Sequence, residues 1–259
     1  MAHSGRQPVT GLTHQTAASF LATQEHLAAS TFNRRYAALR SFARWCHQQG
    51  WLEDDLLVGL ERRPQPRTGQ RALDPEQVEA VLRSIRDLRD RALFSLIYDG
   101  GLRCNEALAI NIEDIDWTER AIRVHGKGDR GREMFFSRRV SRYLDDYLRR
   151  RGEPTLGPLF ITARKARSPR RVDLTAGGYA RLSYRQADTL WKKYTPDWDL
   201  HQLRHTAITT RAAQGYSEVE LKRFSGHQSL RSLEVYIADN REAAKRKARN
   251  WEHHDSAAY

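Results

Sequence analysis

Four separated segments of the chain carry basic or nucleophilic side chains beside a glycine or at the expected start of a helix. They are "GGLRCNE" with Arg103, "HGKGDRG" with Lys127, "HQLRH" with His201, Arg204 and His205, and "GHQSLRSLEVY" with His227 and Tyr236. Tyr236 follows His227 by nine residues. On a helix, His201, Arg204 and His205 would share one stripe, where apolar residues are expected. Such a local conflict is typical of a functional site.

These residue types suit phosphoryl transfer. Negative charge develops on the non-bridging oxygens in the transition state, and fixed guanidinium groups can match it with paired hydrogen bonds. A lysine on a hairpin, such as Lys127, could protonate a leaving alkoxide. The Tyr236 phenol has an ordinary pKa of about 10 and needs help to become a nucleophile. A nearby histidine could accept its proton, and the arginines would favour the phenolate.

The same segments argue against a metal or nucleotide cofactor. His201 and His205 have the spacing of a zinc-binding helix, but no glutamate follows the first histidine. Arg204 between them would repel a cation. Two cysteines cannot supply a four-thiolate zinc site, and no Walker-type glycine loop occurs. We therefore expect neither a metal nor another cofactor.

Composition indicates a globular, strongly basic protein. The 259 residues are 39% hydrophobic and carry a formal net charge of +12. This balance favours a polyanionic partner, nucleic acid ahead of an anionic membrane, although an inert basic surface would have the same composition. The segment "MAHSGRQPVTGL" lacks the apolar core expected of a signal peptide, and no apolar run approaches membrane-spanning length. We expect a cytoplasmic, nucleoid-associated protein with no membrane partner.

The hydrophobic pattern predicts two helical regions joined by a basic linker. We expect a helical domain over residues 1–60, a linker over 61–71, and a catalytic domain over 72–259 that ends in a charged tail helix. In the first domain, Thr13 should cap one helix and Ser30 or Thr31 the next. The tail could dock on a neighbouring copy through Trp251 or remain a frayed end, and the sequence leaves both open.

In the second domain, the apolar period changes from helical to alternating and back. Asp74 and Pro75 should begin a helix, and the run around "HGKGDRG" predicts a β-hairpin. Residues 163–171 form a basic loop in this prediction. Further helical patterns cover 138–151, 177–193, 201–214, 217–224 and 229–238. The fold class is therefore mainly α with a small antiparallel β-sheet.

The ordered motifs "GLRCNE", the lysine hairpin, "HQLRH", "GH" and the later tyrosine resemble the signature of the tyrosine recombinase (phage integrase) family, in its short Xer-like or simple integrase members. The resemblance extends from about residue 10 nearly to the end of the chain. It implies a site-specific DNA recombinase with a truncated, SAM-like helical core-binding domain and a C-terminal catalytic domain. The implied partners are a double-stranded DNA recombination site, three further copies in a tetramer on DNA, and accessory DNA-bending proteins.

The resemblance also implies a role for each site residue. Tyr236 would attack the scissile phosphate and form a 3′-phosphotyrosyl bond, which stores the bond energy without ATP or metal. Arg103 and Arg204 would clamp the phosphate, His227 would donate a hydrogen bond to it, Lys127 would protonate the 5′-oxygen, and His201 would act as general base. Glu106 and His205 are interpreted as supporting residues.

Arginines and lysines outside these motifs are candidate DNA contacts. They lie in the helix over 31–49, in the linker and in the basic loop. They are Arg34, Arg35, Arg40, Arg44, Arg62, Arg63, Arg67, Arg164, Lys165, Arg167, Arg170 and Arg171. For the helix over 31–49, a merely solvated arginine face is an equally good interpretation.

We expect the chain to depart from the family pattern in three places. By the resemblance, the first helix corresponds to the third of a four-helix core-binding domain, so roughly the first two helices are expected to be missing. Phe224 and Ser225 replace leucines just before "GH", and Cys104 and Asn105 stand where a β-branched residue and Ser or Gly are commoner. Two other functions remain open. One is a non-catalytic DNA-binding accessory or regulator on the same scaffold, and the other is a type IB topoisomerase or telomere resolvase.

Overall fold

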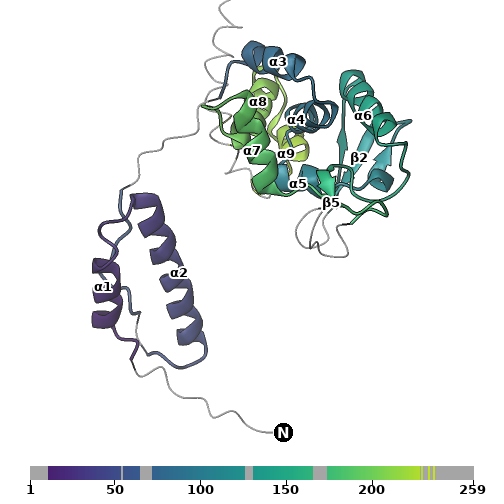
Figure 1. Ribbon diagram of the computed structural model, residues 1–259. Helices are drawn as coiled ribbons and strands as arrows, with labels where there is room; N and C mark the ends of the chain where they lie inside the picture. The colour runs from purple at the N-terminus through teal and green to yellow at the C-terminus, as the bar shows by residue number, and fades with distance from the viewer. Residues whose placement is uncertain are drawn as a thin grey trace, which may run out of the picture. The chain divides into compact units, whose positions relative to one another are not determined.

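The computed structural model describes residues 11–53, 55–64, 72–125, 131–165 and 174–227, together with Ser229, Leu233 and Tyr236. The chain divides into two compact units, Met1–Thr68 and Gly69–Tyr259 (Figure 1). Each unit has its own buried apolar cluster, so each is described by itself.

Two helices form the N-terminal unit. Helix α1 (His14–Ala22) begins at Thr13, as predicted, where the hydroxyl accepts a hydrogen bond from the Thr16 N–H at 3.2 Å. Helix α2 (Ala29–Gln48) begins earlier than predicted, at Ala28 rather than at Ser30 or Thr31. The Ala28 carbonyl already accepts the N–H groups of the next turn, so no side-chain cap selects the start.

Arg63 serves the N-terminal unit itself. Its guanidinium lies 4.2 Å from the centre of the Phe32 ring and donates hydrogen bonds to the carbonyls of Glu25 and Leu27, at 2.9 and 3.0 Å. These contacts hold the segment after α2 against the start of that helix. Arg63, predicted as a DNA contact, is therefore engaged within the protein, because its Nη1 donates to two carbonyls of the turn before α2.

The second unit is built around α4 (Leu88–Gly100). Ala92, Leu93 and Phe94 have no exposed surface, and the helix packs against both α6 and α8 (Figure 1). The other helices are α3 (Pro75–Ser84), α5 (Cys104–Ala109), the 3-10 turn η1 (Ile112–Asp114), α6 (Arg138–Arg150), α7 (Tyr184–Tyr194), α8 (Leu200–Ala213) and α9 (Glu218–Ser225). Asp74 caps α3, with Pro75 in the first turn, as predicted.

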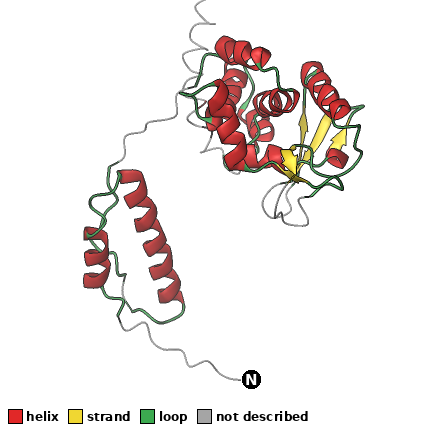
Figure 2. Cartoon of the chain, viewed as in Figure 1, coloured by secondary structure: helices red, strands yellow, loops and turns green. Residues whose placement is uncertain are grey.

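The strands form two small antiparallel sheets. The first has the order β1 (Ile115–Asp116), β2 (Ala121–Val124), β3 (Arg132–Phe135), and its register places Ile122 opposite Met134. The second pairs β4 (Ile161–Lys165) with β5 (Tyr179–Arg181). Figure 2 shows the strands on one side of this unit and α3, α7 and α8 on the other. The prediction of a mainly helical chain with a small antiparallel sheet is confirmed.

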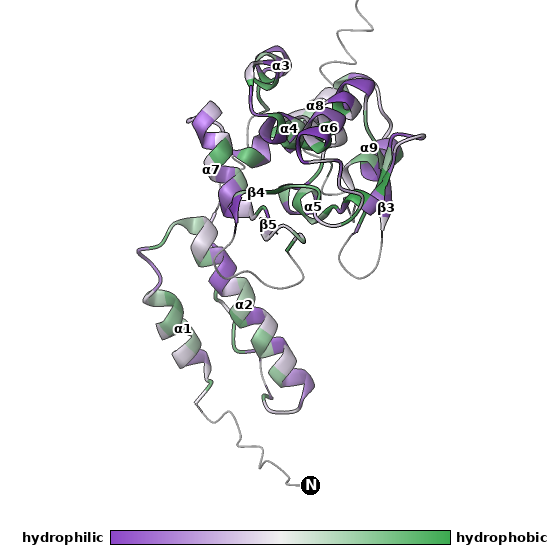
Figure 3. Cartoon of the chain, turned by 45° about the vertical axis from the view of Figure 1, so that its right-hand side comes forward, coloured by the Kyte–Doolittle hydropathy of each residue, from purple (hydrophilic) through white to green (hydrophobic). Residues whose placement is uncertain are grey.

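Two local predictions in this unit are wrong. The helix expected over 177–193 is a strand at Tyr179–Arg181, and α7 begins only at Tyr184, where Ser183 is the cap. Residues 163–165 of the expected basic loop belong to β4. Pairing between β4 and β5 supplies the backbone partners, which a single segment's hydrophobic pattern does not reveal. Helix α7 itself has one buried face, formed by Ala187 and Trp191, and is otherwise mostly hydrophilic (Figure 3).

Candidate active site

Glu106 in α5 joins three arginines from three elements. Its carboxylate accepts hydrogen bonds from the backbone N–H and Nη1 of Arg103, at 3.1 and 2.8 Å. Arg132 Nη2, at the start of β3, donates to Glu106 Oε2 at 3.0 Å. Arg204 Nη1, in α8, lies 3.9 Å from the same oxygen. The single negative charge of Glu106 therefore lies among three guanidinium groups, and the site keeps a net positive charge.

This surrounding sets the charge of Glu106. Burial raises the pKa of a carboxyl group, but hydrogen bonding and charge from Arg132, with further hydrogen bonds from Arg103, outweigh it. The pKa of Glu106 consequently lies below its ordinary value. The group is a carboxylate at neutral pH and can orient the guanidiniums.

Arg204 is buried and held from both sides. It is 2% exposed, and it donates to the carbonyl of Gly101 at 2.7 Å and to that of Ser225 at 2.8 Å. Gly101 ends α4 at a left-handed φ of 56°, a conformation that glycine adopts without strain. Burial, then the charge of Arg103, lower the pKa of Arg204 to about 10. The guanidinium stays charged at neutral pH and is fixed in direction.

One residue, Gly226, separates α9 from His227, and the site leaves no room for a side chain on it. Gly226 has a φ of 65°, and a Cβ on it would lie 2.6 Å from Arg132 Nη1. The His227 ring is within 3.4 Å of Arg204 Nη2 at Nε2 and 2.6 Å from the Ser225 hydroxyl at Nδ1. Burial, then the charges of Arg204, Arg103 and Arg132, lower the pKa of His227 to about 4. The ring is therefore neutral at pH 7.

Tyr236 is buried beside two histidines. It is 7% exposed and belongs to an apolar cluster with Ile208 and Leu221. Its ring centre lies 4.8 Å from that of His205 and 6.0 Å from that of His227. Burial raises the pKa of Tyr236, while Arg204 and Arg103 act in the opposite direction. The phenol is thus protonated at neutral pH and needs a proton acceptor before it can attack.

The two histidines of α8 have different surroundings. His205 is buried against Tyr236. His201, one turn earlier, keeps access to solvent. Partial desolvation of its ring, then the charges of Arg204 and Arg103, lower the pKa of His201. A neutral imidazole at this position can accept a proton.

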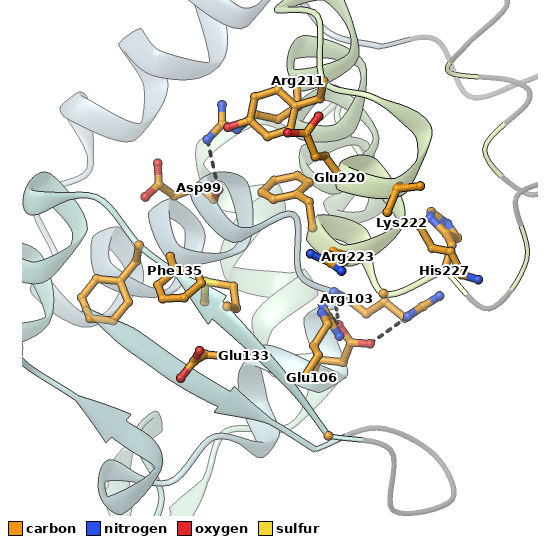
Figure 4. A pocket seen from close by; sticks show the side chains of 18 of the residues that line it. Asp99, Arg103, Glu106, Glu133, Phe135, Arg211, Glu220, Lys222, Arg223 and His227 are labelled. Carbon is orange, nitrogen blue, oxygen red and sulfur yellow. Dashed lines mark hydrogen bonds and ion pairs between the residues drawn. The ribbon is translucent and has the colours of Figure 1, made fainter. Parts of the chain in front are cut away.

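A cleft of about 1210 Å³ opens from this cluster. Arg103, Glu106 and His227 lie at one end of it, and Phe135 lies toward the other (Figure 4). Phe135 is 62% exposed, so the far end of the cleft presents an accessible apolar side chain. The cationic end is the part that could receive a phosphate.

The structure brings together six of the eight predicted catalytic and supporting residues. They are Arg103, Glu106, Arg204, His205, His227 and Tyr236. His201 lies at the solvent side of α8, close enough to Arg204 and Arg103 for their charges to lower its pKa. Lys127 falls in the hairpin segment 126–130, outside the described residues.

Candidate DNA contacts divide similarly. Arg34, Arg35, Arg40, Arg44 and Arg62 are exposed in the N-terminal unit, and Arg164 and Lys165 are exposed at the end of β4. Arg67, Arg167, Arg170 and Arg171 lie outside the described residues, as does the tail after Tyr236.

Sequence reasoning missed Arg132 and the role of Ser225. Arg132 precedes the buried Met134 by two residues in β3, so alternation places both on the inward side. An arginine at an inward strand position was a signal for the site. Ser225 was noted only as a departure from a leucine.

Metal and membrane sites are missing from the described part of the chain. Its histidine, cysteine and acidic side chains form no group of three suited to a metal ion. Over the same residues, no helix has the length and apolarity needed to cross a membrane.

The profile of the phage integrase family matches residues 71–243, about two thirds of the chain. The chain belongs to the phage integrase family. The tyrosine recombinase XerC of Myxococcus xanthus is 31% identical over 240 residues, which cover 86% of this chain and 77% of the relative. The XerC of Lactobacillus delbrueckii subsp. bulgaricus is 28% identical over 229 residues, covering 83% and 74%. Membership in this family of recombinases confirms the resemblance and makes the chain a tyrosine-type site-specific recombinase.

Solved structures show the same integrase fold. XerH site-specific recombinase bound to a palindromic difH substrate superposes with a TM-score of 0.67 at 20% identity, over 94% of this chain and 74% of that one. The Tn1549 transposon integrase in complex with a circular intermediate DNA gives 0.66 at 16% identity, over 95% and 89%.

Proposed function

We propose that this integrase-family chain cuts and rejoins DNA strands at a specific site through a 3′-phosphotyrosyl bond on Tyr236. The observation that supports the proposal is the cluster itself. Three guanidiniums surround one carboxylate, and a neutral histidine lies beside one of them and a buried tyrosine. Such a site suits a phosphodiester, whose charge grows in the transition state.

In this mechanism Arg103 and Arg204 bind the non-bridging oxygens of the scissile phosphate. Arg103 is partly exposed and can meet DNA directly, whereas Arg204 is fixed by two backbone carbonyls. Fixed donors lose little freedom when charge develops, which is the source of their effect on the rate. Glu106 holds the arginines in place without contacting the phosphate.

Proton transfers complete the reaction. The Tyr236 Oη attacks phosphorus as its proton passes to His201, the bond to the 5′-oxygen breaks, and Lys127 protonates that oxygen. Because Tyr236 starts buried, it must move toward the phosphate before attack. Strand rejoining is the reverse reaction with a new 5′-hydroxyl, so the phosphotyrosine conserves the energy of the bond.

The partner of this site is double-stranded DNA. We further propose that four copies assemble on two DNA sites to exchange strands, with accessory DNA-bending proteins where the site needs them. The exposed arginines of α2 and the basic end of β4 supply phosphate contacts outside the active site.

Trapping of a covalent adduct tests the proposal. A pool of nicked duplexes with a randomised centre is first enriched for binding to the chain and is then incubated with it. A nick beside the cleavage point releases a short fragment and leaves protein on DNA, seen on a denaturing gel. We expect an adduct with the unaltered chain and with Tyr184→Phe, an exposed tyrosine outside the site. Tyr236→Phe should give none.

Other outcomes select the alternatives. Binding without an adduct from any duplex would favour an accessory DNA-binding protein. An adduct, together with relaxation of supercoiled DNA and no recombined products, would favour a topoisomerase.

A further inference from the structure

Ser225 occupies a position where its hydroxyl contacts both a backbone carbonyl and the His227 ring. It lies in the last turn of α9 with no exposed surface. Its Oγ is 2.6 Å from the Leu221 carbonyl oxygen and 2.6 Å from His227 Nδ1. The leucine expected at this position could make neither contact.

The hydroxyl has a single proton, and its two neighbours compete for it. A carbonyl oxygen only accepts hydrogen bonds, so the short contact with Leu221 requires the Ser225 hydroxyl to donate there. Only the lone pairs of Oγ then remain for the histidine. His227 Nδ1 must therefore carry a hydrogen and donate it to Ser225.

The other side of the ring leads to the same assignment. His227 Nε2 lies 3.4 Å from Arg204 Nη2. A guanidinium is a donor and never an acceptor, so Nε2 must present its lone pair to Arg204. The two neighbours of the ring thus select one neutral tautomer, with hydrogen on Nδ1 and none on Nε2.

We propose that Ser225 is a positioning residue that holds His227 in the Nδ1–H tautomer and directs its Nε2 lone pair at Arg204. His227 then braces the buried guanidinium against α9 before DNA arrives, in addition to the carbonyls of Gly101 and Ser225. In this neutral form Nε2 carries no hydrogen, so the hydrogen bond to the phosphate that the resemblance implies for His227 requires the ring to gain a proton or change tautomer when DNA binds. The pKa of His227, about 4 because of burial and three nearby arginines, keeps the ring neutral at pH 7. The consequence for DNA cleavage rests on the proposed function, whereas the tautomer does not.

Nuclear magnetic resonance of the full chain without DNA tests the tautomer directly. Histidine rings are labelled with ¹⁵N, and long-range ¹H–¹⁵N correlations at pH 7.5 distinguish protonated from unprotonated ring nitrogens. Comparison with His227→Gln identifies the signals of His227. We expect a protonated Nδ1 and an unprotonated Nε2. A hydrogen on Nε2 would overturn the inference.

Variants test whether Ser225 is the cause. In Ser225→Ala, Nδ1 loses its acceptor, so the two ring nitrogens should move toward averaged signals from two tautomers. Single-turnover cleavage of a trapped duplex should fall roughly two- to tenfold at unchanged DNA affinity, as expected for one neutral hydrogen bond. Ser225→Thr keeps the hydroxyl and should restore the single tautomer.

Ser95→Ala provides the matched control. Ser95 is equally buried, in α4, and among the described residues its hydroxyl has no hydrogen-bond partner. This variant should change neither the spectrum nor cleavage. An unchanged His227 spectrum in a folded Ser225→Ala would overturn the role of Ser225, and if that variant does not fold, the spectrum of the unaltered chain decides. Absence of any DNA adduct alongside the expected spectrum would overturn the proposed function and leave the tautomer intact.

Discussion

Arg132 Nη2 donates to Glu106 Oε2 at 3.0 Å, although 26 residues separate the two along the chain. The contact joins the sheet to the short helix that carries Arg103. Arg103 and Arg204 alone would face each other as like charges with one carboxylate between them. Because Arg132 belongs to β3, the number of positive charges around Glu106 depends on the position of that strand.

Removing the charge of Glu106 should weaken both folding and cleavage. Glu106→Gln leaves three close guanidiniums with no counter-charge, and it exchanges an acceptor oxygen for a donor. We expect the free energy of unfolding to fall by about 1–3 kcal/mol, the cost of leaving partly buried polar groups unpaired. Urea denaturation measures this change, and adduct formation reports cleavage. Glu119→Gln, in an exposed turn, should have no effect on either; equal losses in both variants would contradict the role of Glu106.

A methyl group at Gly226 should disturb the site beyond its backbone cost. Gly226→Ala must adopt a left-handed φ and places Cβ 2.6 Å from Arg132 Nη1. Gly152→Ala has a φ of 86° but nothing within 4 Å of its Cβ. Each should lose about 1 kcal/mol of stability from the backbone alone. Only Gly226→Ala should lower the rate of adduct formation, measured by single-turnover kinetics. Full activity of Gly226→Ala would show that Arg132 can move without consequence.

Acid should destabilise the fold through His227. Its pKa is about 4 in the folded chain against an ordinary 6.5. Between these values the unfolded chain binds more protons than the folded chain, so the free energy of unfolding decreases as the pH falls from 6.5 to 4. His227→Gln removes this contribution and should give a shallower decrease. The free energy of unfolding is measured by urea denaturation at several pH values for both proteins. The difference between the two curves separates the contribution of His227 from that of the other titratable groups. Parallel curves would mean that His227 is not held neutral.

Arginines of the N-terminal unit should separate into structural and DNA-binding residues. Arg63→Gln removes the contacts to Phe32 and two carbonyls, and should lower the stability of the unit by about 1–2 kcal/mol. Arg34→Gln, on the exposed face of α2, should leave stability unchanged. It should reduce the slope of log affinity for DNA against log salt by about 0.9, one phosphate contact. Thermal unfolding and salt titrations measure the two effects. An unchanged slope for Arg34→Gln would favour a merely solvated helix face.

Local patterns were sufficient for most helices of the chain. Thr13 and Asp74 mark helix starts that depend on the backbone of a few neighbouring residues, and the structure has them where the sequence predicts. Residues 177–183 were mispredicted because strand β5 exists only through its pairing with β4. The start of α2 lacks a side-chain cap, so no residue type announces it.

The sequence by itself determined the family, the order of its reactive residues and the hairpin between β2 and β3, because spacing and residue type carry that information. Only the tertiary structure decided what these residues contact. Arg204 meets the Gly101 carbonyl 103 residues away, Arg63 contacts Phe32 and two backbone carbonyls of its own unit, and the Ser225 hydroxyl meets His227. Hydrogen-bond partners, burial and the resulting pKa values depend on which segments pack together, and a linear pattern does not contain those distances.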